Sequence, residues 1–188
     1  GIESRSDGNL QPFTGDIDEV AIWNRSLTDA EIRNHYLRGV LNLTFQVRSC
    51  DDSACVGESF VGGDNTVNTF FKNATFGNLS NISSNRWFQY RAYFSTNDIN
   101  YTPVLQEVII MGNNSAQLVL INHTNSSAFE ERYNRTTSDG ENVTLNKNVS
   151  GNYSTMPIAG VFTSQITDSG AGANWNNIGN IEHENLPS

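Results

Sequence analysis

The chain has 188 residues, with 11 Lys and Arg against 20 Asp and Glu, and its formal net charge is −9. This acidic balance excludes the basic surface by which proteins bind nucleic acids or anionic lipids, and the apolar runs are too short to cross a bilayer. Charged residues make up only 16% of the chain, so its polar character comes instead from 26 Asn, 19 Ser and 15 Thr.

A strand followed by a helix is predicted near the start of the chain. Residues 17–23 alternate with the period of two that is typical of a strand. Thr28 and Glu31 have the spacing of a capping box, in which each residue bonds the backbone of the other at a helix N-terminus. Gly39 favours a left-handed C-cap. The sequence therefore predicts one short helix over residues 29–38.

This region also resembles a known family. The string FTGDIDEVAIWNRSLTDAEIRNHYLRG at 13–39 is similar to the last strand and helix of concanavalin A-like, or laminin G-like, jelly rolls. The matching positions are Phe13, Gly15, Ile17, Asp18, Glu19, Val20, Trp23, Asn24, Leu27, Glu31 and Ile32. Because the match covers only the end of such a domain, we expect residues 1–40 to be its terminal strand and helix, and the chain to be a segment of a larger protein.

The pattern then becomes all-β, and an antiparallel β-sandwich of jelly-roll or immunoglobulin-like type is expected. Strand candidates, separated by Gly, Asn, Asp and Ser clusters, cover residues 42–50, 55–62, 68–76, 86–96 and 103–112. In the fourth of them, one face carries Phe88, Tyr90, Ala92 and Phe94, which predicts the central strand of the core.

Cys50 and Cys55 are the only cysteines of the chain. A zinc site would need two more ligands, and the three histidines are distant in the sequence; a redox motif would have two intervening residues rather than four. In an oxidising compartment we expect a local disulfide between them. Asp51 and Asp52 are interpreted as turn residues rather than calcium ligands. No metal and no cofactor are expected.

Residues 41–113 are similar to a β-sandwich module that recurs in large archaeal and bacterial surface proteins. The features that carry this resemblance are the Cys50–Cys55 pair, the aromatic strand from Arg86 to Phe94, and Pro103 before the last strand. In such proteins the module often follows laminin G-like domains, as it does here. The resemblance implies no catalytic or ligand residue.

The remainder of the chain divides into two parts. Residues 114–157 are expected to form connecting strands, at 116–122 and 141–148, with an exposed loop at 125–140. Residues 158–188 are expected to begin a second module or to supply strands to another one. Within them, 160–178 resembles the opening strands of the same surface module, although here they follow the body.

The body at 41–113 therefore lacks strands that the end of the chain can supply. The end can fold back on its own chain, or it can be donated to the next copy, as in donor-strand complementation. We predict the second arrangement: a head-to-tail filament joined through residues 158–180. Phe162 and Ile166 would face the acceptor core, and Trp175 is a third candidate for subunit contact. A simple truncation of a repeat array is the alternative.

Asparagine is concentrated in the N-glycosylation pattern Asn-x-Ser/Thr. The 13 matches are Asn24, Asn42, Asn73, Asn78, Asn81, Asn100, Asn113, Asn122, Asn125, Asn134, Asn142, Asn148 and Asn152. Random placement would give about five matches, so the excess predicts covalent N-glycans and an extracellular or cell-surface location. The alternative is that Asn, Ser and Thr cluster in turns and match the pattern by chance.

No catalytic site is predicted. Asp16, Asp18 and Glu19 resemble the acidic strand of laminarinase-type glucanases, in which paired carboxylates flank the glycosidic bond. The further acidic residue of that pattern is replaced by Ala21 and Ile22. The sequence also lacks a nucleophile elbow, a phosphate loop and a His-based metal motif. We therefore expect no enzyme activity.

Two functions from different classes remain. The sequence favours a structural extracellular glycoprotein, a subunit of a cell-surface filament, sheath or S-layer-like assembly. The alternative is a carbohydrate-binding module or adhesin of a secreted modular protein, with Trp87, Tyr93 and Trp175 as stacking residues; an accessory part of a secreted carbohydrate-active enzyme is a third. Trp87 and Tyr93 equally fit packing against a neighbouring domain or glycan. The expected partners are other copies of the chain, covalent glycans and, in the alternative, carbohydrate.

Overall fold

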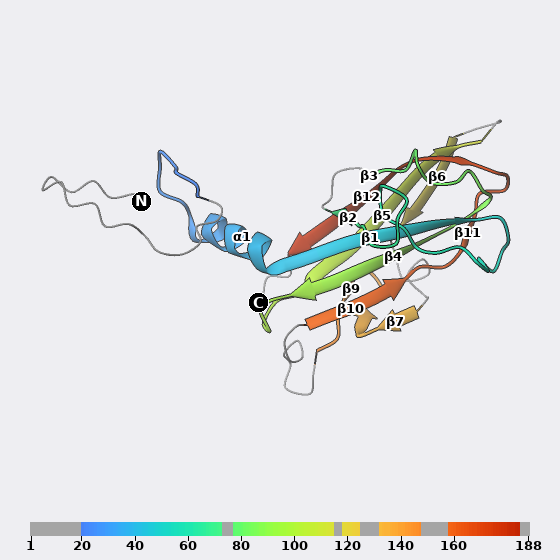
Figure 1. Ribbon diagram of the computed structural model, residues 1–188. Coiled ribbons are helices and arrows are strands. Elements are labelled where there is room, and N and C mark those ends of the chain that lie inside the picture. Colours follow the sequence, from blue (N-terminus) through green and yellow to red (C-terminus); the bar gives the residue numbers. More distant parts are fainter. Residues whose placement is uncertain (1–19, 73–76, 115–117, 125–131, 148–157, 185–188) are drawn as a thin grey trace, which may run out of the picture.

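The computed structural model describes residues 20–72, 77–114, 118–124, 132–147 and 158–184. One helix, α1 (Asp29–Val40), precedes two antiparallel sheets that pack together as a β-sandwich (Figure 1). The first sheet contains β1 (Leu41–Cys50), β2 (Phe71–Lys72), β4 (Trp87–Thr96), β7 (Arg132–Asn134), β10 (Ile158–Thr163) and β11 (Thr167–Asp168). The second contains β3 (Gly77–Asn78), β5 (Pro103–Asn113), β6 (Leu118–His123), β8 (Thr136–Ser138), β9 (Val143–Leu145) and β12 (Asn174–Glu184).

Strand β4 is the centre of the first sheet, as its sequence predicts. It pairs with β1 along one edge and with β10 along the other. Its alternate residues Phe88, Tyr90, Ala92 and Phe94 are all buried in the cluster between the sheets. Because successive side chains of a strand point to opposite faces, the intervening residues lie on the outer face of the sheet.

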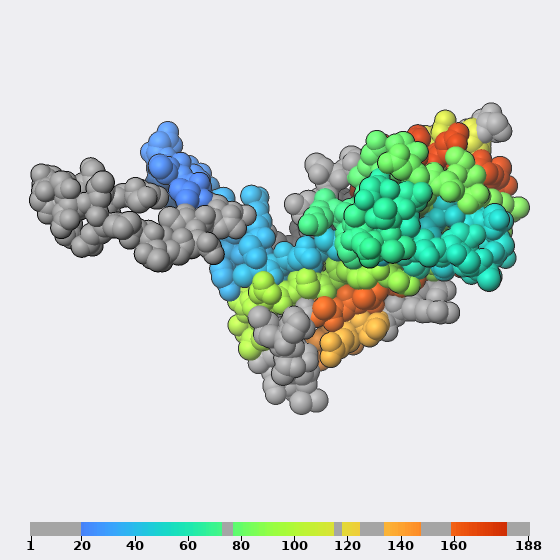
Figure 2. Space-filling view, viewed as in Figure 1, coloured from blue at the N-terminus to red at the C-terminus, as the bar shows by residue number. Residues whose placement is uncertain are grey.

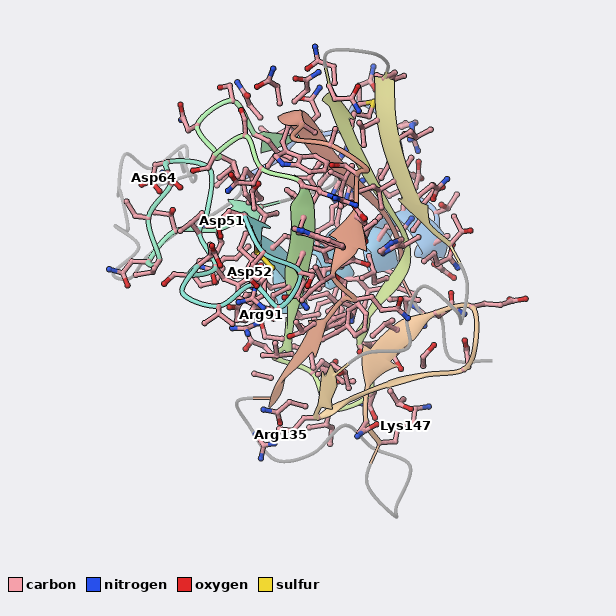
Figure 3. The ribbon with its side chains drawn as sticks, turned by 90° about the vertical axis from the view of Figure 1, so that its right-hand side faces the viewer. Asp51, Asp52, Asp64, Arg91, Arg135 and Lys147 are labelled. Carbon is pink, nitrogen blue, oxygen red and sulfur yellow. A yellow bond between two sulfur atoms is a disulfide. The ribbon has the colours of Figure 1, made fainter. Side chains whose placement is uncertain are left out.

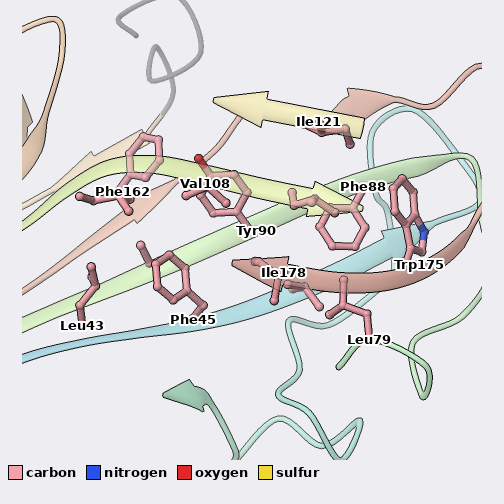
Figure 4. Packing of buried hydrophobic residues seen from close by; sticks show 14 of the residues in the cluster. Leu43, Phe45, Leu79, Phe88, Tyr90, Val108, Ile121, Phe162, Trp175 and Ile178 are labelled. Carbon is pink, nitrogen blue, oxygen red and sulfur yellow. The ribbon is translucent and has the colours of Figure 1, made fainter. Parts of the chain in front are cut away.

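The end of the chain completes both sheets of its own sandwich. Strand β10 pairs with β4 in a register that sets Phe162 opposite Ala92, and β12 runs along β5. Phe162 is 0% exposed and Trp175 only 2%, and both belong to the same core as the residues of β1 and β4 (Figure 4). This is the fold-back arrangement, so the single chain closes its core without a strand from another copy.

Helix α1 begins at the predicted capping box. Thr28 accepts the backbone N–H of Glu31, whose carboxylate in turn accepts the backbone N–H of Thr28. Arg25 and Thr28 both bond this carboxylate, and they lower the pKa of Glu31 to about 2. The helix predicted near residues 29–38 is present, but Gly39 is not its left-handed C-cap, because Gly39 is helical and shows no left-handed φ. The helix continues to Val40 and passes directly into β1.

The segment before α1 does not form the predicted strand over its described residues. Residues 20–23 have no strand partner, and the side chains of Val20, Ile22 and Trp23 are exposed. In Figure 2 this segment and most of α1 stand off from the sandwich. The helix contacts it through the buried side chain of Leu37, a hydrogen bond from Tyr36 to Asp98, and the guanidinium of Arg33 over the ring of Tyr101.

Two further expectations about strands are wrong in detail. Residues 55–62 form no strand beyond a single bridge between Val61 and Val47, since Cys55 and Gly57 have left-handed φ values of 51° and 108°. The expected loop at 125–140 contains β7 and β8, with residues 125–131 lying outside the described part. The short pair β8–β9 extends the second sheet beside β5.

A buried histidine contact joins the two sheets at Tyr90. The Tyr90 hydroxyl and His123 Nδ1 are 3.2 Å apart, and burial lowers the pKa of His123 below its ordinary value. The unfolded chain therefore binds a proton near pH 6.5 that the folded chain does not bind. The contribution of neutral His123 to the unfolding free energy is fully present above that pH. It is lost as the pH drops toward the lower pKa of His123 in the folded state.

Replacing His123 with Gln is expected to remove this pH dependence. From pH 7.5 to 5.5, the unfolding free energy of the unsubstituted protein should fall relative to that of the variant, by at most about 1.4 kcal/mol per pH unit. Urea unfolding of both proteins across this range measures the difference. An identical slope in the two proteins would contradict the assignment of this effect to His123.

Candidate functional site

A cavity lies on the outer face of the first sheet. Its volume is about 860 Å³, and it lies beneath the loop that joins β1 to β2. Outward-facing polar residues of β1 and β4 form its floor: Gln46, Arg48, Gln89 and Arg91. The remaining lining residues are Ser53, Ala54, Glu58, Ser59, Phe60, Val67, Thr163, Gln165 and Ile166. We refer to this cavity as the polar pocket.

Arg48 fixes the loop over the floor of the polar pocket. Its Nη1 donates to the backbone oxygens of Cys55 and Glu58, at 3.0 and 3.2 Å. Its Nε donates to Gln89 Oε1 at 2.8 Å, and Gln89 Nε2 donates to the backbone oxygen of Ser164 at the end of β10. The guanidinium of Arg48 therefore connects three separate parts of the chain, and its main role is structural.

Arg91 offers the positive charge that can meet a ligand in the polar pocket. Its guanidinium carbon lies 3.9 Å from the centre of the Phe60 ring, and its Nε donates to Thr163 Oγ1. Arg48 lies over the same ring at 4.6 Å. Both guanidinium groups thus contact the Phe60 ring, and Arg91 remains partly exposed.

Three carboxylates gather on the loop that covers the polar pocket, and one of them, Glu58, also lines the pocket. Oxygen atoms of Asp51, Asp52 and Glu58 lie within 4.8 Å of one another, and Figure 3 shows the two aspartates on the loop. The carboxylate of Asp52 accepts the backbone N–H groups of Ala54 and Val56, which is the turn role predicted for it. Glu58 lies far enough along the chain that spacing in the sequence does not reveal this cluster.

The disulfide predicted at the entrance of this loop is present. Cys50 and Cys55 are joined, and both are buried. Changing both to Ser is expected to lower the unfolding free energy by about 2 kcal/mol and to leave the fold intact, because the closed loop is short. Urea unfolding measures the loss. Free thiols in a non-reduced peptide map, or an unfolded double variant, would contradict this expectation.

The candidate stacking aromatics do not form an open platform. Trp175 is buried: its indole N–H donates to Ser49 Oγ at 3.0 Å, and its ring lies 4.4 Å from that of Phe88. Tyr93 is half-buried, and the ring of Phe70 meets it edge-on, with ring centres 5.1 Å apart. Trp87 is half-buried, with the guanidinium of Arg86 over its ring. The expectation that Trp175 is an exposed sugar-stacking residue is therefore wrong.

The sequon asparagines form the other candidate functional surface. Those within the described residues are Asn24, Asn42, Asn78, Asn81, Asn100, Asn113, Asn122, Asn134 and Asn142. All are exposed except Asn142, which is half-buried. None of the polar-pocket residues belongs to this set. Asn73, Asn125, Asn148 and Asn152 lie outside the described residues, as do Asp16, Asp18 and Glu19.

The predicted subunit-contact residues Phe162, Ile166 and Trp175 make contacts within their own chain. Phe162 and Trp175 are core residues, whereas Ile166 is half-buried and lines the polar pocket. The polar pocket itself was not predicted from the sequence. The sequence signal for the pocket is the row of Gln and Arg at the outward positions of the β1 and β4 segments. A sheet face exposed only to solvent would not require two arginines there.

Comparisons with known proteins give no family assignment: no family model, no curated protein and no solved structure matches this chain. Among the described residues, no helix is long and apolar enough to span a membrane.

Proposed function

We propose that the chain is a structural module of an extracellular, cell-surface glycoprotein. The observation that carries the proposal is the placement of the sequons: no described sequon asparagine is buried, although they occur on both sheets and on the segment before α1. Attached sugars need exposed acceptors on the folded surface. The Cys50–Cys55 disulfide supports the same compartment, because such bonds persist outside the reducing cytoplasm.

The shape of the molecule is consistent with a spacer within a larger assembly. Helix α1 leads into the sandwich at one end of β1, and the described residues after it build a single core. Assembly into a filament, sheath or S-layer-like array remains part of the proposal. Exchange of residues 158–180 between copies would require each chain to withdraw Phe162 and Trp175 from its own core, so the folded monomer has a barrier against it.

A second candidate function rests on the polar pocket. Arg91 and the carboxylate of Glu58 line a cavity of a size suited to a small ligand. This would fit a carbohydrate-binding module or adhesin, the alternative that the sequence left open.

A comparison of the unsubstituted chain with one variant separates the two functions. The glycosylated chain and an Arg91→Ala variant are applied to a glycan array and examined by electron microscopy without ligand. The structural function predicts no glycan binding that depends on Arg91, together with regular assemblies at high protein concentration. Glycan binding that is lost in the variant, without assemblies, would instead assign the chain to the carbohydrate-binding class.

A further inference from the structure

The outer face of the second sheet carries an exposed apolar patch on β5 and β6. Leu118 and Leu120 on β6 are 67% and 59% exposed. Ile109 and Met111 on β5 are half-buried. They lie beside the two leucines, since Met111 is paired directly with Leu120. We call these four residues the β5–β6 patch. The residues between them, such as Ile110 and Ile121, face the core, so the patch is not needed to close the sandwich.

Sequon asparagines stand at both ends of this patch. The register of β5 and β6 sets Asn122 opposite Ile109, and Asn113 opposite Leu118. Paired residues of an antiparallel sheet project to the same face, with Cβ atoms about 5 Å apart. Both asparagines are exposed, so a sugar on either would start directly beside an apolar side chain of the patch.

A third sequon lies on the same face, across the sheet. Asn78 on β3 is paired with Asn177 on β12, and Asn177 is in turn paired with Met111. Neighbouring strands are about 4.8 Å apart, so Asn78 lies about 10 Å from the patch. Three of the sequons therefore lie around one apolar surface.

Without a cover, the β5–β6 patch would favour association of the chain with other chains. Among the described strands, β6 pairs only with β5, so its other edge is open. Exposed apolar side chains on an open edge strand favour pairing with other chains. The first sheet differs: its outer face at the polar pocket presents Gln46, Arg48, Gln89 and Arg91, and no sequon lines it.

We propose that N-linked glycans on Asn78, Asn113 and Asn122 cover the β5–β6 patch and prevent edge pairing through β6. The occupant of the patch is thus the chain's own sugar, whose bulk and hydration exclude another chain while the C–H faces of its rings meet the apolar side chains. This inference rests on the proposed function, since it requires that the sequons be glycosylated.

The experiment compares two triple variants made in a glycosylating secretory host. The patch variant carries Asn78→Gln, Asn113→Gln and Asn122→Gln. The control variant removes the same number of sequons elsewhere, at Asn24, Asn42 and Asn134. At a dilute protein concentration, below that at which the unsubstituted chain forms assemblies, light scattering after size exclusion should show that the patch variant loses its monomer peak to dimers and larger species, whereas the control variant remains monomeric.

A rescue ties the effect to the apolar side chains. Adding Leu118→Thr and Leu120→Thr to the patch variant should restore the monomer, because the substituted edge is polar and no longer needs cover. If the patch variant fails to fold, the glycans are instead removed enzymatically from the folded unsubstituted protein, which should then associate. A patch variant as monomeric as the control, a failed rescue, or deglycosylated protein that stays monomeric would each overturn the inference.

Two further readouts separate failure of the glycan cover from failure of the proposed function. Bare asparagine at every sequon would refute the proposed function, whereas occupied sequons with no change in association would refute only the cover. A glycosylated, unsubstituted chain that is already dimeric, and becomes monomeric with Leu120→Thr, would assign the patch to a second copy and would also overturn the inference.

Discussion

A Phe162→Ala variant is expected to lose about 3–5 kcal/mol of unfolding free energy, as is usual when a buried aromatic ring is truncated. Phe162 is fully buried on β10, and its ring packs 6.1 Å from that of Tyr90 at the centre of β4. The loss combines the lost transfer energy of the ring with the cavity that it leaves, since neighbouring side chains can only partly fill the space. Urea unfolding of the purified chain measures the loss.

The same measurement tests whether β10 pairs with β4 of its own chain or with β4 of another copy. In the fold-back arrangement, the unfolding midpoints of the unsubstituted chain and of Phe162→Ala are independent of protein concentration. Exchange of β10 between copies would make both midpoints rise with concentration. Leu118→Ala is the control, because this exposed side chain should change the stability by less than about 0.5 kcal/mol. Equal losses in the two variants, or midpoints that depend on concentration, would contradict the arrangement.

The second large effect is expected for Trp175→Ala, again about 3–5 kcal/mol. Trp175 lies where β12 faces β4, and its indole connects the two sheets through Phe88 and through the hydrogen bond to Ser49 on β1. Truncation opens a cavity at this junction and also leaves the buried Ser49 hydroxyl without this donor. Because Trp175 is one of three tryptophans, its removal changes the fluorescence signal, so unfolding is followed by circular dichroism.

A Trp175→Phe variant separates packing from hydrogen bonding. It retains most of the buried ring but removes the N–H donor to Ser49, so it should cost about 1–2 kcal/mol. A Trp175→Ala variant no less stable than Trp175→Phe would mean that Trp175 does not fill the junction between the sheets.

The sequence predicted those parts of the fold that depend on local pattern. Strand β4 was recognisable because Phe88, Tyr90 and Phe94 recur at every second residue, and the helix start because Thr28 and Glu31 form a local capping box. These signals arise from residues that are close in sequence. They therefore remain readable without knowledge of the tertiary contacts.

The pairing of strands could not be predicted in this way. Nothing in the local pattern of residues 158–184 specifies that β10 pairs with β4 and β12 with β5, because the partners lie about 70 residues away in the chain. The same limitation hid the polar pocket and the acidic cluster. Glu58 meets Asp51 and Asp52 only because Arg48 and the disulfide fold the loop back on itself.

The central proposal is tested most directly by site-resolved glycopeptide mapping of natively produced protein, with the intact mass as a check. We expect sugar on most of the exposed sequon asparagines, including Asn78, Asn113 and Asn122, and a mass for this chain well above its polypeptide mass of 20.8 kDa. Unmodified asparagine at these sites, and a mass equal to that of the bare polypeptide, would contradict the assignment of the chain as an extracellular glycoprotein.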